Sequence, residues 1–233
     1  MPARNLIFIH IPKAAGTTLR KILKTQYPNK RWLQIDGSRP QESFAEFKNK
    51  DINERKEIRC LFGHIPYGVH EALVGSSQYI TILRHPVERI ISHYYYILRQ
   101  PSHYLYQQVA EKKLSLKDYV TSGLSSQELE NGQTWLISGK NYNNSESLAI
   151  AKQNLQKHFI GVGITEQFDR SLAIFQQRLG WQKIDYESAN VTPNRPQRNE
   201  ISPEIITLIE KLNYLDMELY DFANLLFTKS LQD

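Results

Sequence analysis

Short apolar runs alternate along this chain with longer stretches in which apolar residues recur every three or four positions. Residues 5–11 form a β-branched and aromatic run with the length of a buried strand. Residues 16–26 then carry Leu19, Ile22 and Leu23 at helical spacing. The start of the chain therefore predicts a strand, a loop and a helix, in that order.

The same alternation continues to the C-terminus. Further short strands are predicted at residues 31–35, 58–62, 78–83 and 159–164. Helices are predicted at residues 86–98, in pieces within 115–158, at 168–179 and within 203–227, and the polar stretch 41–56 indicates a solvated helix and loop. This order is typical of an α/β fold with a mostly parallel sheet covered on both faces, which binds ligands at the carboxyl ends of its strands.

Composition fits one ordinary domain spanning residues 1–233. The chain is 40% hydrophobic and carries no internal repeat, which excludes disordered, collagenous and repeat proteins. No apolar run reaches the roughly 18 residues of a membrane helix, so we expect a soluble chain without a membrane span. A single cysteine, Cys60, allows neither an internal disulfide nor a cysteine-based metal site, and a cytoplasmic location is expected.

The charge balance favours anionic ligands without specifying one. Lys and Arg number 29 against 24 Asp and Glu, a net charge of +5, but the positive residues are dispersed. Duplex nucleic acid usually requires a denser basic stripe, so no nucleic acid partner is expected. A nucleotide or an acidic glycan would satisfy the excess equally well.

The turn after the first predicted strand has the chemistry of an anion cradle. It brings Lys13, Gly16, Thr17 and Thr18 to the N-terminus of a helix, where free N–H groups and the helix dipole attract phosphate. A kinase-type loop would have a glycine in place of Ile11 and a lysine directly after Gly16. ATP with magnesium is therefore disfavoured.

A second anion site is indicated in the next strand–helix unit. Arg84 ends the predicted strand at 78–83, and Ser92 follows two turns into the next helix. Arginine offers a planar donor fork that suits phosphate, and a serine hydroxyl completes such a site. An ion pair of Arg84 with a helix glutamate is the structural alternative.

The two segments resemble the nucleotide-binding signatures of sulfotransferases that use 3′-phosphoadenosine 5′-phosphosulfate. In that family a P-K-[AST]-[AG]-[GST]-[GST]-[ST] loop binds the 5′-phosphosulfate, and R-[DNEH]-P-x-x-R-x-x-S binds the 3′-phosphate. Residues 84–92 match the second signature with its interval from Arg84 to Ser92. With His10 before the loop, the chain is most similar to the carbohydrate branch, which includes heparan sulfate 2-O- and 6-O-sulfotransferases and bacterial relatives.

The resemblance extends over most of the chain. It includes Phe62-Gly63-His64, Asn131-Gly132-Gln133-Thr134 with Gly139, Gly163 to Phe168, Asn190-Val191-Thr192, Arg198, and Asp216 to Tyr220. It implies a P-loop-like three-layer α/β/α fold with a central mostly parallel sheet and extra helices. It also implies 3′-phosphoadenosine 5′-phosphosulfate as the sulfuryl donor, in-line transfer to a hydroxyl, and no metal.

The resemblance assigns a role to each candidate residue. His64 is the expected general base, because histidine has a pKa of about 6.5 and is neutral near pH 7, and Lys13 stabilises the leaving phosphate. The expected donor-binding residues are Lys13, Ala14, Ala15, Gly16, Thr17 and Thr18 for the 5′-phosphosulfate, and Arg84, Ser92 and Arg198 for the 3′-phosphate. Gln133 and Thr134 are expected to line the cleft and contact substrate.

Two alternatives stay open at this point. One is a small-molecule kinase of the same architecture, although the lysine after Gly16 is missing. The other is a non-catalytic nucleotide-binding or scaffold protein. The acceptor, a carbohydrate or a small molecule, would contact residues 99–144 and the loop near Pro193, whose compositions specify neither it nor the oligomeric state.

Overall fold

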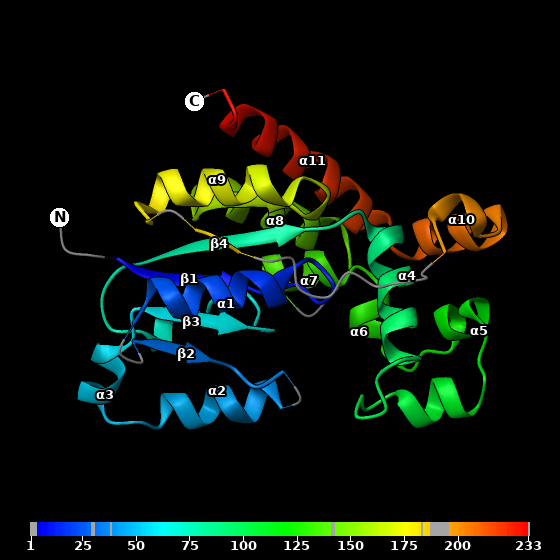
Figure 1. The fold of residues 1–233 in the computed structure, drawn as a ribbon, viewed down its shortest axis with the longest axis horizontal. Helices are drawn as coiled ribbons and strands as arrows, with labels where there is room; N and C mark the ends of the chain where they lie inside the picture. Colours follow the sequence, from blue (N-terminus) through cyan, green and yellow to red (C-terminus); the bar gives the residue numbers. More distant parts are fainter. Residues whose placement is uncertain are drawn as a thin grey trace.

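The fold is built on one parallel β-sheet. The computed structural model describes residues 4–28, 31–37, 39–140, 143–182, 184–186 and 196–232. In this part of the chain five strands, all parallel, lie in the order β2-β3-β1-β4-β5 (Figure 1). The strands are β1 (Asn5–Ile9), β2 (Trp32–Gln34), β3 (Cys60–Gly63), β4 (Ser77–Leu83) and β5 (Phe159–Ile164).

The central position of β1 follows from its composition. All five residues of Asn5–Ile9 are buried, as expected of a strand covered on both faces. Ile9 pairs with Gly63 of β3 on one side and with Thr81 of β4 on the other. The loop that follows β1 therefore begins between two neighbouring strand ends, which is where α/β proteins bind ligands.

Helices cover both faces of the sheet, which confirms the predicted layered α/β/α architecture. Figure 1 shows α1 (Gly16–Gln26) and α9 (Phe168–Leu179) on one face and α7 (Gly132–Ser138) and α8 (Ser145–Lys157) on the other. The remaining elements around the sheet are α2 (Pro40–Lys48), α3 (Ile52–Glu57), η1 (Val69–Ala72), η3 (Thr165–Gln167) and α11 (Tyr214–Ser230). Contact with α9 is close, because a Cβ on Gly161 of β5 would lie 2.6 Å from the Phe175 ring.

A second helical layer stands beyond the carboxyl ends of the strands. It contains α4 (Pro86–Ile97), η2 (Gln107–Glu111), α5 (Leu116–Thr121), α6 (Ser126–Leu129), η4 (Arg198–Glu200) and α10 (Pro203–Leu212). Buried side chains of α4, including Val87, Ile90 and Ile97, pack in a separate apolar cluster with Val109 and Ile209. This cluster holds the helices as a wall beside the strand ends.

The predicted element types are confirmed, except that the stretch predicted as a helix and loop at 41–56 contains two helices, α2 and α3; the other differences are at element ends. β3 is Cys60–Gly63 rather than 58–62, because its register with β1 extends to the Ile9–Gly63 pair. β2 is shorter than residues 31–35. No helix within the described residues is long and apolar enough to cross a membrane. The segment Asn190-Val191-Thr192 and the loop at Pro193 lie outside the described residues.

Candidate active site

The turn between β1 and α1 is tightly constrained. Lys13 and Ala15 have φ angles of 66° and 56°, a left-handed conformation that costs a non-glycine residue roughly 1–2 kcal/mol. Helix α1 begins at Gly16, where an added Cβ would lie 1.8 Å from Cδ2 of His10. Glycine is therefore required because the His10 ring packs directly against the helix N-terminus.

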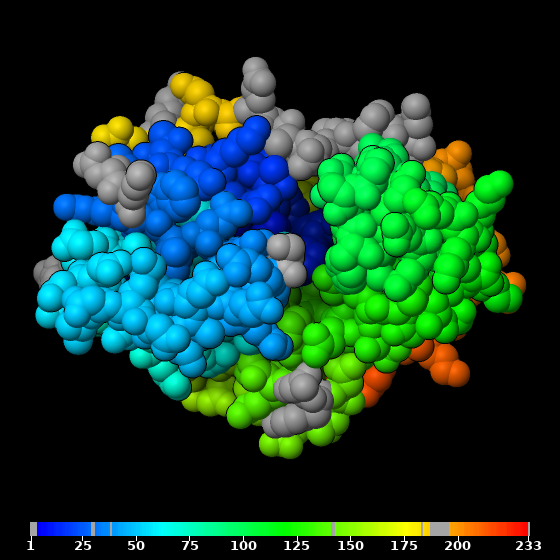
Figure 2. Space-filling model, turned by 90° about the horizontal axis from the view of Figure 1, so that it is seen from below, coloured from blue at the N-terminus to red at the C-terminus, as the bar shows by residue number. Residues whose placement is uncertain are grey.

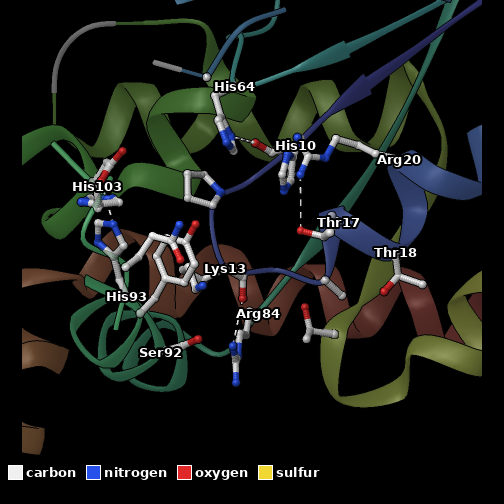
Figure 3. A pocket seen from close by; sticks show the side chains of 18 of the residues that line it. His10, Lys13, Thr17, Thr18, Arg20, His64, Arg84, Ser92, His93 and His103 are labelled. Carbon is white, nitrogen blue, oxygen red and sulfur yellow. Dashed lines mark hydrogen bonds and ion pairs between the residues drawn. The ribbon is translucent and has the colours of Figure 1, made fainter. Parts of the chain in front are cut away.

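A cavity of about 720 Å³ opens at this turn. Figure 2 shows it as a hollow between the blue N-terminal segments and the green helical segment, and Figure 3 shows its side chains. Of the residues expected from the sequence, the cavity brings together Lys13, Ala15, Gly16, Thr17, Thr18, His64, Arg84 and Ser92. These come from the β1–α1 loop, the end of β3 and the β4–α4 unit.

His64 is held in a defined tautomer. Its Nδ1 lies 2.7 Å from the carbonyl oxygen of His10. Because a carbonyl only accepts hydrogen bonds, Nδ1 carries the proton and Nε2 keeps its lone pair. Burial lowers the pKa of His64, the hydrogen bond to the His10 carbonyl opposes this, and the charge of Arg20 lowers the pKa further. His64 is therefore neutral near pH 7 and can accept a proton at Nε2.

His10 supports His64 from inside the turn. The two rings lie 4.3 Å apart, and burial lowers the pKa of His10 well below its ordinary value. The buried Nδ1 of His10 has no hydrogen-bond partner among the described residues. His10 is thus packed inside the fold and also lines the cavity.

Lys13 projects into the cavity and lies over an aromatic ring. Its Nζ is 3.6 Å from the centre of the Tyr96 ring, a cation–π contact. The carbonyl oxygen of Lys13 accepts a hydrogen bond of 2.9 Å from Nη1 of Arg84. Lys13 therefore connects the phosphate loop to Arg84 and to helix α4.

Arg84 and Ser92 lie in the same cavity, as the spacing of their motif predicted. Arg84 Nη2 lies 3.7 Å from Oε2 of Glu88, so the ion pair considered as a structural alternative is also present. Ser92 is 4% exposed and lines the cavity from α4. Both side chains thus border one space together with Lys13.

Gln133 and Thr134 do not line the cavity, contrary to expectation. Both are fully buried. Gln133 Oε1 accepts from the backbone N–H of Arg84 at 3.0 Å, and its Nε2 donates to the Arg84 carbonyl at 2.9 Å. Gln133 therefore fixes the backbone of Arg84 at the end of β4, and its effect on any ligand is indirect.

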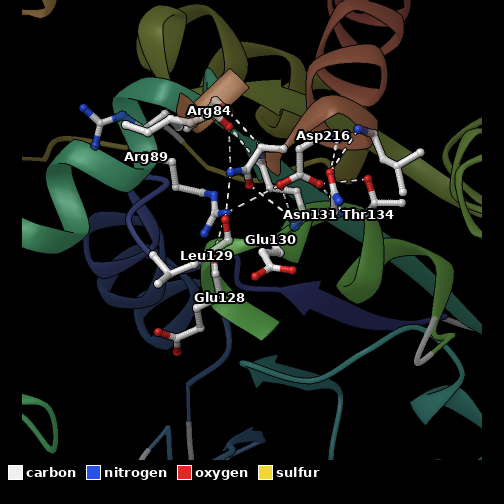
Figure 4. Close-up of polar contacts among 12 residues, drawn as sticks. Arg84, Arg89, Glu128, Leu129, Glu130, Asn131, Thr134 and Asp216 are labelled. Carbon is white, nitrogen blue, oxygen red and sulfur yellow. Dashed lines mark hydrogen bonds and ion pairs between the residues drawn. The ribbon is translucent and has the colours of Figure 1, made fainter. Parts of the chain in front are cut away.

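Thr134 belongs to a buried junction between α7 and α11. Asp216 Oδ1 accepts from the N–H of Thr134 at 2.7 Å and from its hydroxyl at 2.8 Å, and Oδ2 accepts from the N–H of Gln133. Asn131 Oδ1 accepts in return from the N–H groups of Leu215 and Asp216 (Figure 4). The side chains thus satisfy N–H groups at both helix starts, which explains this motif structurally.

Two further candidates are placed differently from expectation. Ala14 is buried and donates its N–H to the carbonyl of Ile11, so it is not among the residues lining the cavity. Arg198 pairs with Glu210 at 2.7 Å and lies 3.3 Å from Nε2 of His85, in a smaller neighbouring cavity. Its expected contact with the 3′-phosphate stays a prediction.

The cavity also contains residues that the sequence reasoning did not select. They include Arg20, His93, Tyr96, His103, Tyr104 and Glu128, together with Thr165 and Phe168. Helical spacing was an available signal for two of them, because Arg20 follows Gly16 by four residues and Tyr96 follows Ser92 by four. The described residues contain no group of three His, Cys, Asp or Glu side chains that would hold a metal ion.

Comparisons with known proteins give the family of the chain. Residues 1–223 match the model of the sulfotransferase family. Heparan sulfate 2-O-sulfotransferase hst-2 of Caenorhabditis elegans is 28% identical over 66% of this chain and 53% of its own length. Human heparan-sulfate 6-O-sulfotransferase 2 is 26% identical over 97% of this chain and 45% of its own length. Mouse galactose-3-O-sulfotransferase 2 is 22% identical over 99% of this chain and 63% of its own length. The chain spans about half the length of the heparan sulfate relatives.

A solved structure shares the fold. The crystal structure of mouse sulfotransferase SULT7A1 complexed with PAP superposes with a TM-score of 0.51 at 13% identity. The match covers 99% of this chain and 89% of the mouse chain.

Proposed function

Because the chain belongs to the sulfotransferase family, we propose that it transfers a sulfuryl group from 3′-phosphoadenosine 5′-phosphosulfate to a hydroxyl of a carbohydrate-like acceptor. The observation that carries the proposal is the meeting of Lys13, His64, Arg84 and Ser92 around one cavity at the carboxyl ends of the strands. A cytoplasmic location and a single domain over residues 1–233 stay predictions from the sequence.

The residues of the turn fit the phosphosulfate end of the donor. The left-handed residues Lys13 and Ala15 form a turn at the N-terminus of α1, a geometry typical of anion-binding loops. Gly16 keeps the helix start open beside His10, and the hydroxyls of Thr17 and Thr18 border the cavity. These groups would hold the 5′-phosphate.

The 3′-phosphate would be held by Arg84 and Ser92. Arg84 is held in place by two sets of hydrogen bonds. Its side chain donates to the Lys13 carbonyl, and its backbone N–H and C=O pair with the Gln133 side chain. Such a fixed guanidinium binds phosphate with less loss of entropy than a mobile one. This pair would distinguish the donor from a nucleotide without the 3′-phosphate.

In the reaction, the bond from sulfur to the bridging oxygen of the donor breaks, and a bond from sulfur to the acceptor oxygen forms. His64 Nε2 takes the acceptor's hydroxyl proton, for which its neutral tautomer is suited. Lys13 Nζ leaves the Tyr96 ring to neutralise the charge that grows on the leaving phosphate oxygen. None of these steps requires a metal ion.

The test is calorimetric titration with 3′-phosphoadenosine 5′-phosphate, the desulfated donor, in EDTA. We expect binding that weakens at least tenfold in Arg84→Ala and in Ser92→Ala, as charge-assisted hydrogen bonds are worth about 1.5–3 kcal/mol. Adenosine monophosphate is the control for the 3′-phosphate. Equal affinity for both nucleotides, or no binding of either, would overturn the proposal in favour of a kinase or scaffold.

A further inference from the structure

Charged side chains are distributed unevenly around the cavity. Among the described lining residues, the lysine and arginines are Lys13, Arg20 and Arg84, all on the β1–α1 turn, α1 and the end of β4. The wall that begins at Tyr96 on α4 and ends on α6 contributes Gln100, Ser102, His103, Tyr104 and Glu128 to the cavity lining. These cations thus come from the elements that carry the proposed donor-binding residues. We call the second wall the helical wall; among its described residues that line the cavity, only Glu128 carries a fixed charge.

Glu128 is firmly held within the helical wall. Its Oε2 lies 3.2 Å from Nε2 of His93, 3.2 Å from the hydroxyl of Ser125 and 3.4 Å from that of Tyr104. Its side chain keeps 29% of its surface exposed. Figure 4 shows the carboxylate pointing away from the Arg89–Asp216 contacts. A carboxylate oxygen has about two acceptor positions, so the three contacts at Oε2 occupy that oxygen and leave Oε1 to accept from a ligand.

Hydrogen bonds from Tyr119 to His93 and from His93 to Glu128 fix the orientation of the Glu128 carboxylate. Burial lowers the pKa of His93 well below its ordinary value, and its Nδ1 lies 2.9 Å from the hydroxyl of Tyr119. In the neutral ring Nε2–H donates to Glu128, and Nδ1 accepts from Tyr119. Burial raises the pKa of Glu128, while the charge of Arg89 and hydrogen bonds from Ser125 and Tyr104 oppose this. The carboxylate is therefore positioned before any ligand arrives.

We propose that Glu128 is an acceptor-binding residue that selects a non-anionic saccharide, uncharged or carrying an amine, and rejects a polyanionic one. Hydroxyl and ammonium groups of such an acceptor donate to the free positions of the carboxylate, whereas an acceptor carboxylate or sulfate meets a like charge on a partly desolvated wall. Tyr96 and Tyr104 add aromatic surface for the sugar rings. The inference rests on the proposed function and concerns its acceptor.

The experiment compares three oligosaccharides of equal length in the presence of saturating donor. They are a glucosamine oligosaccharide, an N-acetylglucosamine oligosaccharide and N-acetylheparosan, which carries uronate carboxylates. We expect kcat/KM to be highest for the amine and lowest for heparosan. Glu128→Gln should raise KM for the amine by about tenfold or more, the loss of one charge-assisted contact, and should raise kcat/KM for heparosan.

Two controls keep the result specific. Glu111→Gln changes an exposed carboxylate of the same helical layer outside the cavity and should leave all three kcat/KM values unchanged. The affinity for 3′-phosphoadenosine 5′-phosphate should be unchanged in Glu128→Gln, whose amide oxygen still accepts from His93. The inference would be overturned if heparosan were the best acceptor, or if Glu128→Gln left the order of the three kcat/KM values unaltered. The proposed function would still stand in that case, provided that the nucleotide binds. Loss of 3′-phosphate-dependent binding in the wild type would instead overturn the function itself.

Discussion

Replacing Gly16 by alanine tests the packing that shapes the phosphate turn. The new Cβ would lie 1.8 Å from Cδ2 and 1.9 Å from Nε2 of His10, whereas ordinary carbon contacts are about 3.5–4.0 Å. The ring must therefore shift by roughly 2 Å. It has little room, because it lies 5.5 Å from the Phe8 ring and 4.3 Å from the His64 ring.

Overpacking of this kind costs about 1–3 kcal/mol. The backbone of Gly16 is not in the left-handed region, so alanine fits the helix there and gains up to about 1 kcal/mol of helix propensity. We therefore expect Gly16→Ala to destabilise the wild type but to be neutral or stabilising in a His10→Ala background. The gain in helix propensity is the same in both backgrounds, so the difference between the two effects should equal the overpacking cost, about 1–3 kcal/mol.

The assay is urea unfolding of the wild type, both single variants and the double variant, with the affinity for 3′-phosphoadenosine 5′-phosphate measured in parallel. Gly16→Ala alone should also weaken nucleotide binding, because the displaced ring disturbs the helix start and His64. A destabilisation of Gly16→Ala that is the same with and without His10 would refute the reasoning, since the three atoms nearest to the added Cβ all belong to that ring.

Three further predictions concern the surroundings of the site. Arg20→Gln removes a charge that lowers the pKa of His64, so the acid limb of kcat/KM, which should lie below pH 6.5, should move to higher pH. Gln133→Met leaves the partly buried N–H and C=O groups of Arg84 unpaired, so urea unfolding should show a loss of about 1–3 kcal/mol and calorimetry a weaker affinity for 3′-phosphoadenosine 5′-phosphate. Asp216→Ala leaves buried Arg89 without its ion-pair partner and two helix N–H groups without their acceptor. It should lower the free energy of unfolding by about 3–5 kcal/mol in the same assay, whereas Asp221→Ala, at an exposed position of the same helix, should lower it little.

The sequence was informative where the chemistry is local. The phosphate turn and its helix are consecutive in the chain, and Arg84 and Ser92 lie on one strand–helix unit, so spacing alone could bring them to one edge of the sheet. His64 follows a buried strand directly, and parallel strands end at the same edge. These residues line one cavity, as their positions predicted.

The sequence was least informative where a role depends on distant partners. Gln133 was expected to contact substrate, but its burial follows from Asp216, 83 residues further along the chain, and from Arg84, 49 residues before it. Glu128 meets His93 only after α4 and α6 pack together. No local pattern marks such contacts, whereas Arg20 could have been found from its helical distance to Gly16.

We propose that a sulfuryl group is transferred in this cavity with His64 as the base. The most direct measurement is single-turnover transfer of radiolabelled sulfate from 3′-phosphoadenosine 5′-phosphosulfate, in EDTA, to a mixture of uncharged, amine-bearing and carboxylated oligosaccharides. Wild type should form labelled saccharide, and His64→Ala should lose about 10²–10⁴-fold in rate with unchanged affinity for the desulfated donor. Labelled saccharide formed at the same rate by both proteins, or by neither while the nucleotide binds, would contradict the account.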